Sequence, residues 1–241
     1  MVAYSVAKVK TMKSQLRKIL LLSTLSFLLV VPSGVSAQGR GQDEEFKYRW
    51  QLRNFMGTLA SLFLPRQGEG SLTFKTDRNG RLRSELTITS SATRQGEYFR
   101  YGSELDVRTL QPIRAWSAYS WRGETKSKND PILQDGVLDV ASGIYAIRQN
   151  PPEKSRRMEI WSDGKIYPVV VIPLGLETRK SRDGKTMEVR HYSIRGIDVP
   201  GRRKWKGKLD LWLARDEAAT PVEIVISRNL ADVHMELKSL L

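Results

Sequence analysis

The sequence predicts a mainly β protein, in which a mostly antiparallel sheet carries one short helix on its concave face. Two observations predict this fold class. Apolar side chains recur at every second position in several segments, and Asn-Gly or Asp-Gly pairs lie between such segments. A period of two gives a strand one buried face, and these dipeptides tolerate the positive φ angles of tight hairpins. Because hairpins connect antiparallel strands, we do not expect parallel crossover units.

The first predicted strand is the segment in which Phe46, Tyr48, Trp50 and Leu52 alternate with polar side chains. A helix would scatter these four residues around its surface, whereas a strand places them on one face. The same alternation predicts strands over residues 82–88, 105–107, 113–121, 209–213, 222–226 and 231–237.

A further strand is predicted over residues 166–174, which are apolar on both faces and should therefore be covered on both sides. Pro168 and Pro173 have no N–H to donate, which favours an edge strand or a bulge. The predicted hairpin turns are Asn79-Gly80, Asp163-Gly164 and Asp183-Gly184.

One segment has the period of a helix. Asp139 can cap it, and Val140, Ile144 and Ile147 form one apolar stripe that ends before two prolines. Because so short a helix needs tertiary packing, we expect its stripe to lie on the concave face of the sheet. Polar connections are predicted over residues 122–131 and 150–157.

The chain begins with features of an export signal. Basic residues precede an apolar run over residues 19–31, and small residues lead to an Ala37-Gln38 junction. A run this short does not reach the roughly 20 residues of a membrane-spanning helix. We therefore predict a signal peptide over 1–37, a flexible leader over 38–45 and a single β-rich domain over 46–241. The alternative is an uncleaved anchor, and Met12 is an alternative start.

These features predict a periplasmic or secreted protein with no transmembrane anchor after cleavage. The sequence has 40 Lys and Arg against 26 Asp and Glu, and it has no cysteine. Disulfide scaffolds, cysteine metal sites and a lipid-modified cysteine are thereby excluded. The basic charge favours binding to anionic envelope material, although a solvated surface explains it equally well.

No residue pattern names a reaction. The only histidines are His191 and His234, and the sequence has neither a Gly-x-Ser-x-Gly motif nor a phosphate loop. We expect His234 to be exposed and His191 to be structural, with a bulge or twist near it. We therefore predict no enzyme, no metal and no cofactor; a hydrolase of envelope polymers that uses His191 is the least favoured hypothesis. Carboxylates available to such an enzyme are Glu177, Glu188, Asp210 and Asp216.

Basic and aromatic residues are interleaved in two segments, residues 47–50 and 202–206. In a cytoplasmic protein this pattern would indicate binding of single-stranded nucleic acid, but the export signal argues against it, and we expect no nucleic acid partner. An anionic amphiphile fits better, with aromatic side chains against acyl chains and basic side chains near headgroups. The alternative is an ordinary core with a charged exterior.

The order of these features resembles an exported bacterial family, domain of unknown function 3108. The resemblance rests on the aromatic first strand, Gly57-Thr58, the helix 139–148, the strand 169–177, and the motif 211–216 followed by Pro221. It implies a periplasmic β-rich protein with an architecture like that of the lipoprotein carriers LolA and LolB, which is a strongly curved antiparallel sheet closed by helix. The resemblance brings no catalytic or lipid-contact residues.

The leading hypothesis is therefore a soluble envelope protein with a curved sheet or incomplete barrel that binds an apolar or amphipathic ligand without catalysis. The ligand would be a lipid or a lipidated partner such as a lipoprotein. The alternative is an adaptor that docks on another envelope protein through a sheet edge or basic patch. Candidate ligand-lining residues, which could equally be core, are Trp50, Tyr119, Trp121, Ile144 and Trp212.

Overall fold

The computed structural model describes residues 43–53, 66–90, 96–121, 123–180, 184–228 and 231–238. The predicted signal peptide 1–37 and most of the predicted leader lie outside the described residues, and so does the side chain of Trp121. Among the described residues no helix is long and apolar enough to cross a bilayer.

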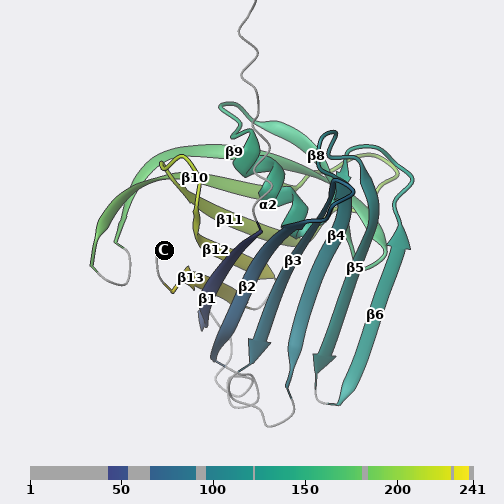
Figure 1. Cartoon of the computed structure of the whole chain (residues 1–241), viewed down its shortest axis with the longest axis horizontal. Coiled ribbons are helices and arrows are strands. Elements are labelled where there is room, and N and C mark those ends of the chain that lie inside the picture. The colour runs from purple at the N-terminus through teal and green to yellow at the C-terminus, as the bar shows by residue number, and fades with distance from the viewer. Residues whose placement is uncertain are drawn as a thin grey trace, which may run out of the picture. The chain divides into compact units, whose positions relative to one another are not determined.

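Thirteen strands form one sheet in the order β6-β5-β4-β3-β2-β1-β13-β12-β11-β10-β9-β8-β7 (Figure 1). All neighbours pair antiparallel except β7 and β8, which are parallel. Because α2 connects these two strands, the expectation of no parallel crossover unit was wrong at this one place. The sheet stays unclosed between β6 and β7, so the predicted fold class is confirmed. The strands are β1 (Glu44–Arg53), β2 (Gln67–Thr76), β3 (Arg81–Ser90), β4 (Tyr98–Asp106), β5 (Pro112–Trp121), β6 (Glu124–Pro131), β7 (Val137–Leu138), β8 (Arg156–Ser162), β9 (Lys165–Lys180), β10 (Thr186–Gly196), β11 (Gly207–Ala214), β12 (Pro221–Arg228) and β13 (Ala231–Leu237).

The sheet has an N-terminal half, β1 to β6, and a C-terminal half, β8 to β13, each built from strands that pair with their sequence neighbours. The halves join where β1 pairs with β13, with Trp50 opposite Met235. β1 starts at Glu44, so Glu44 and Glu45 belong to the sheet and not to the predicted leader.

The single helix of the described residues, α2 (Val140–Gln149), lies on the inner face of the sheet between β3 and β4 on one side and β8 on the other (Figure 1). The inner face is the face that contacts α2, and the outer face is the opposite one. The main core lies between the inner face and α2, as the alternation predicts. Its fully buried large side chains are Tyr48, Phe74, Leu72, Leu82, Leu86, Leu105, Ile144, Ile147, Leu211, Leu213, Ile224 and Met235.

Asp139 fixes the first turn of α2 to the sheet, as its predicted role as a cap requires. Its carboxylate accepts hydrogen bonds from the backbone N–H groups of Ala141 and Ser142. The hydroxyl of Ser103 on β4 donates to the same carboxylate over 2.6 Å, and that of Ser84 on β3 lies 3.4 Å from it. This buried network attaches the helix to two strands.

Arg148 fixes the other end of α2. Its side chain is 1% exposed and donates to both carboxylate oxygens of Glu44, over 2.9 and 3.1 Å. It also donates to the backbone carbonyl groups of Ala218 and Ala219 in the β11–β12 connection. The helix is therefore tied at both ends.

Five of the described strands lie outside the predicted strand segments, namely β2, β6, β7, β8 and β10. β6 lies within the residues 122–131, which were predicted to be a connection. It was missed because nearly all its side chains are exposed and no alternation marks it. β8 was also missed: its first two residues, 156 and 157, were assigned to the predicted connection 150–157, and the rest of the strand was not assigned. β2 carries Gly68 and Gly70 at inner positions, where a Cβ on Gly68 would lie 2.5 Å from the Trp50 indole nitrogen. Because glycines occupy these inner positions, β2 lacks the alternating apolar side chains by which a strand is identified.

Pro173 of β9 lies at a bulge, one of the two predicted possibilities, whereas Pro168 pairs with Glu159 in regular register. β9 lies between β8 and β10 and is not an edge strand. Its register against β10 shifts between His191 and Tyr192, where Pro173 and Gly175 face these two residues and Leu174 is the extra residue. The predicted irregularity near His191 is thus present.

Candidate ligand-binding site

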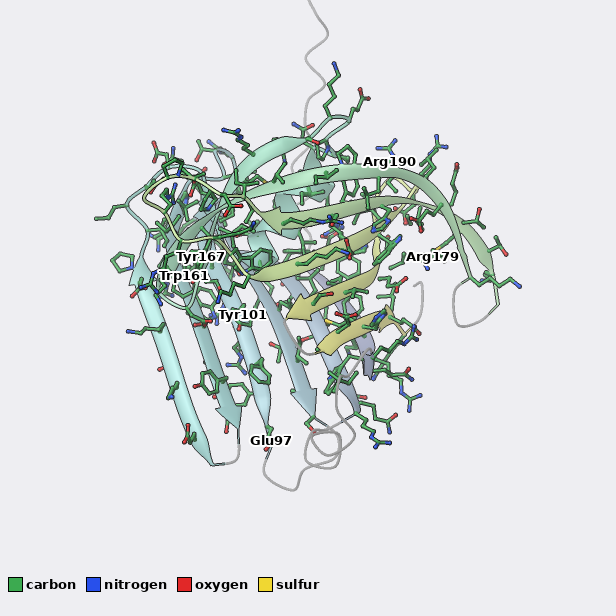
Figure 2. All side chains as sticks on the ribbon, turned by 180° about the vertical axis from the view of Figure 1, so that it is seen from behind. Glu97, Tyr101, Trp161, Tyr167, Arg179 and Arg190 are labelled. Atoms are coloured by element: carbon green, nitrogen blue, oxygen red, sulfur yellow. The ribbon has the colours of Figure 1, made fainter. Side chains whose placement is uncertain are left out.

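A cavity of about 400 Å³ opens on the inner face beside the first turn of α2. Tyr101 on β4 and Tyr167 on β9 line it from the two halves of the sheet (Figure 2). The connection between β10 and β11, residues 197–206, closes one side and is called here the 197–206 segment. The lining residues are Leu86, Tyr101, Val140, Ser162, Asp163, Tyr167, Arg203, Lys204, Trp205, Lys206, Gly207, Leu209, Ile226 and Ser227.

Trp205 reaches the cavity because glycines flank its segment. A Cβ on Gly196 would overlap the backbone of Trp205, and one on Gly207 would lie 2.8 Å from its indole ring. The ring packs at the edge of the main core near Leu209 and Val140. The aromatic wall therefore depends on close backbone approach at two positions that only glycine allows.

Basic side chains gather at the mouth of this cavity. Arg203, Lys204 and Lys206 line it, while Asp163 is its one acidic lining residue. A lining with aromatic and aliphatic residues and a few exposed basic groups suits a ligand that has both an apolar and an anionic part.

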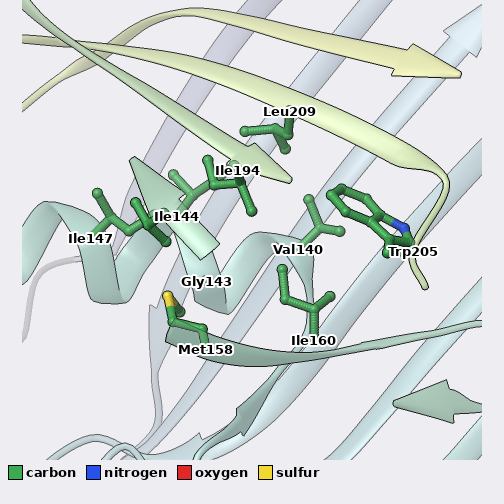
Figure 3. Close-up of a pocket in the computed structure, with 10 residues that line it drawn as sticks. Val140, Gly143, Ile144, Ile147, Met158, Ile160, Ile194, Trp205 and Leu209 are labelled. Carbon is green, nitrogen blue, oxygen red and sulfur yellow. The ribbon is translucent and has the colours of Figure 1, made fainter. Parts of the chain in front are cut away.

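A second, much smaller void lies under α2, with a volume of about 10 Å³ (Figure 3). It is about the size of one water molecule, and its lining is entirely apolar. A Cβ added at Gly143 would meet no atom within 4 Å. Val140, Trp205 and Leu209 line both this void and the large cavity, so the two spaces share a wall.

Of the four predicted lining residues whose side chains the structure describes, none lines the large cavity. Trp50 is buried in the main core and donates its indole N–H to the Thr89 carbonyl over 2.8 Å. Ile144 lines the small void. Tyr119 lies in β5, opposite Phe99 of β4, with which it stacks at 6.0 Å between ring centroids. Trp121 ends β5, and its side chain is outside the described residues.

Trp212 was placed on the wrong face by the prediction. In β11, Leu209, Leu211 and Leu213 belong to the main core, so Trp212 points to the outer face. It is only 6% exposed because a second apolar cluster surrounds it there. The buried members of this outer cluster are Val189, Trp212, Ala214, Val222 and Val225.

His191 stacks on Trp212, at 4.1 Å between ring centroids, and its Nδ1 lies 2.6 Å from Glu177 Oε1. The Trp212 indole N–H donates to the other oxygen of Glu177. Burial opposes the charge of Glu177, but these hydrogen bonds outweigh it and hold the pKa of this carboxyl below its ordinary value. His191 is thus built into the outer cluster and lies on the face opposite the cavity.

His234 is not exposed as predicted. Its side chain is 17% exposed, and it lies on the outer face with its Nδ1 3.7 Å from Glu223 Oε1. Burial, with the charge of Arg53, lowers the pKa of His234. Burial also raises the pKa of Glu223. The described residues contain no group of three or more His, Asp or Glu side chains placed to hold a metal ion.

Sequence reasoning missed most of the cavity. The residues 202–206 were noted for their basic and aromatic side chains, but the sequence could not show that Trp205 would line one cavity with Tyr101 and Tyr167. These two tyrosines occur in strands without any feature that separates a lining residue from a core residue.

Comparisons with known proteins find similarity to a solved structure and to a family model. A solved structure of a beta-barrel-like protein of domain of unknown function DUF1849 from Brucella abortus is similar, with 10% sequence identity and a TM-score of 0.43. The similarity covers 82% of this chain and 96% of that chain. None of the curated proteins matches the sequence. The model of the family DUF3108, described as a protein of unknown function, matches residues 114–238. That match spans more than half of the sequence, and the chain belongs to the DUF3108 family.

Proposed function

We propose that this protein binds an apolar or amphipathic ligand, a lipid or a lipidated partner, in the cavity beside α2, as a non-catalytic protein of the bacterial cell envelope. The observation that carries the proposal is the cavity of about 400 Å³ with aromatic and aliphatic walls. Pockets for small molecules have volumes of roughly 300 to 1,000 Å³ and mostly apolar linings. The predicted export signal supports a location in the cell envelope.

The position of His191 supports a binding role over hydrolysis. The hydrolase hypothesis requires this imidazole near the ligand, but it is stacked on Trp212 on the outer face. Its Nδ1 is engaged by Glu177. A ligand in the cavity would lie on the other side of the sheet.

The test is uptake of a fluorescent fatty acid by delipidated protein, with native mass spectrometry of the protein from its own periplasm. We expect one bound ligand, and the variant Ile226→Trp, which fills part of the cavity, should bind at least ~10-fold more weakly. Ile113→Trp is the matched control, because Ile113 is partly exposed on β5 and does not line the cavity. No uptake by the native chain, or equal uptake by Ile226→Trp, would overturn the proposal.

An adaptor is the second candidate, because β6 forms one edge of the described sheet and exposes almost every side chain. Such an edge can pair with a strand of another protein. However, Lys126, Lys128 and Pro131 on β6 are residue types that oppose pairing at an edge. Two results would favour the adaptor over the ligand carrier. The protein purified from the periplasm would show the mass of the chain without a ligand, and one other protein would crosslink to β6 in a 1:1 ratio.

A further inference from the structure

We infer that the ligand is an anionic amphiphile whose carboxylate or phosphate headgroup is bound by Arg203 and Lys206 at the cavity mouth, while its apolar chain lies against Trp205, Leu209 and Ile226. This inference rests on the proposed function and adds the chemical class of the ligand. It comes from the way charges are paired along one short segment.

Two of the four basic residues of the 197–206 segment form ion pairs, and two do not. Arg202 donates to both carboxylate oxygens of Glu159 on β8, over 2.7 and 2.6 Å, and Lys204 donates to Asp198 over 2.7 Å. Arg203 and Lys206 have no carboxylate partner in the described part of the chain. Both of them line the cavity.

The Arg202–Glu159 pair holds the segment in place, whereas the unpaired Arg203 and Lys206 line the site together with the paired Lys204. The Arg202–Glu159 pair ties the segment to β8, and Trp205 inserts between Gly196 and Gly207. The cations next to Trp205 are therefore held at the mouth by a fixed backbone. Guanidinium and ammonium groups recognise carboxylates and phosphates through charge-assisted hydrogen bonds.

Two further donors line the same cavity. The indole N–H of Trp205 and the hydroxyl group of Tyr167 make no hydrogen bond with any other described residue. Together with Arg203 and Lys206 they leave the lining rich in unused donors. Asp163 is the only carboxylate among the described residues of the lining, so the balance of charge and donors favours an acceptor-rich, negatively charged headgroup.

The apolar part of the ligand follows from the aliphatic residues of the lining. Leu86, Val140, Leu209 and Ile226 come from two strands of the C-terminal half, one strand of the N-terminal half and the start of α2. A volume of about 400 Å³ is near the lower limit for small-molecule pockets. It therefore favours one acyl chain over the several chains of a membrane lipid.

The test measures binding of four C12 compounds below their micellar concentrations to the delipidated full-length protein. Dodecanoate and dodecyl phosphate carry an anionic headgroup, dodecanol a neutral one and dodecylamine a cationic one. We expect both anions to bind at least ~10-fold more tightly than dodecanol, and dodecylamine to bind most weakly, with a preference that shrinks as salt screens the charges. Inorganic phosphate alone should not bind measurably.

The decisive variant is Arg203→Glu/Lys206→Glu. It should lose roughly 100-fold in affinity for both anions, about tenfold for each charge-assisted contact, and keep its affinity for dodecanol. Lys154→Glu/Arg157→Glu is the matched control, because both residues are exposed and absent from the lining. The control should bind every compound as the native protein does.

Each failure points to a different error. Equal affinity for dodecanol and the anions, or an unchanged anion affinity in Arg203→Glu/Lys206→Glu, would refute the headgroup assignment and leave the proposed function standing. Tight binding of inorganic phosphate alone would show a free-anion site and refute the amphiphile. Binding of none of the C12 compounds would refute the proposed function itself.

Discussion

At the scale of single residues, small side chains decide where space exists in this protein. Gly68 and Gly102 have no room for a Cβ, since one on Gly102 would lie 2.5 Å from the Trp116 ring. Gly143 in the middle of α2 differs, because a Cβ there would meet nothing within 4 Å. Its backbone is helical, so it does not need the conformational freedom of glycine.

We therefore predict that Gly143→Ala stabilises the protein. Alanine favours a helix interior over glycine by about 1 kcal/mol, and its methyl group fits into free space beside the small void. Urea unfolding should show a higher midpoint with an unchanged slope. Gly102→Ala is the control and should be destabilising; a stability loss in Gly143→Ala would mean that the space under α2 is not as described.

Residue patterns also explain which site residues could be predicted. The alternation in β1 correctly placed Trp50 on the inner face, because its neighbours on the other face are polar. In β11 the alternation of Leu209, Leu211 and Leu213 already places Trp212 on the other face, so the choice of Trp212 as a lining residue went against the period of its own strand. Trp205 lies in a connection with no period, and its place at the cavity follows from contacts with Gly196 and Gly207 that are visible only in three dimensions.

At the scale of elements, α2 is the part whose attachment matters most. Its start is tied to β3 and β4 through Asp139, and its end to β1 and the β11–β12 connection through Arg148. A helix of ten residues has little stability alone. These ties hold it in place as a wall of the cavity, so the ligand should enter beside the 197–206 segment rather than under a moving helix.

We predict that Arg148→Met destabilises the protein by about 3 kcal/mol. The substitution leaves Glu44 and two backbone carbonyl groups without their donor, and breaking a partly buried pair by removing one partner typically costs 3 to 5 kcal/mol. Chemical denaturation measures the change. The double variant Arg148→Met/Glu44→Gln should recover part of the loss, whereas equal stabilities of the single and double variants would show that Glu44 does not need this partner.

The predictability of elements follows the same physics. Strands with one apolar face and a helix with one apolar stripe were predicted, since burial imposes a period on them. β6 exposes both faces and β2 uses glycine against aromatic rings, so neither shows a period. The antiparallel hairpins were predictable from turn residues, but the pairing of β1 with β13 joins segments far apart in the sequence and leaves no local signal.

At the scale of the whole molecule, both faces of the C-terminal half of the sheet carry packed side chains. The outer cluster around Trp212 includes ionisable neighbours on β9, β10, β12 and β13. Arg179 lies 4.6 Å from the Trp212 ring centroid and connects Glu177 with Glu223. Stability should therefore depend on pH through this face rather than through the cavity.

We predict that His234 makes the fold less stable in mild acid. Its pKa is lower in the folded protein than in the unfolded chain, so the stability it contributes is present above the unfolded pKa of about 6.5 and is lost as the pH falls below it. Glu223 acts in the opposite sense, because its raised pKa contributes stability at low pH that is lost as the pH rises through the folded value.

The measurement is the free energy of unfolding of native protein and His234→Gln between pH 8 and pH 5. The native protein should lose more stability toward pH 5 than His234→Gln, and the difference isolates His234 from Glu223. Glu223→Gln, the control, should make the acid loss steeper. Parallel curves for native protein and His234→Gln would contradict the lowered pKa.

The pairing of the first strand with the last has a consequence for folding. β1 and β13 meet at the centre of the sheet, so the first and last described strands are neighbours inside the fold. During synthesis from the N-terminus, one edge of β1 must stay unpaired until β13 has been made. Such a high contact order slows folding, and an open edge invites association with other chains. This protein should therefore need protection from aggregation until β13 has paired with β1.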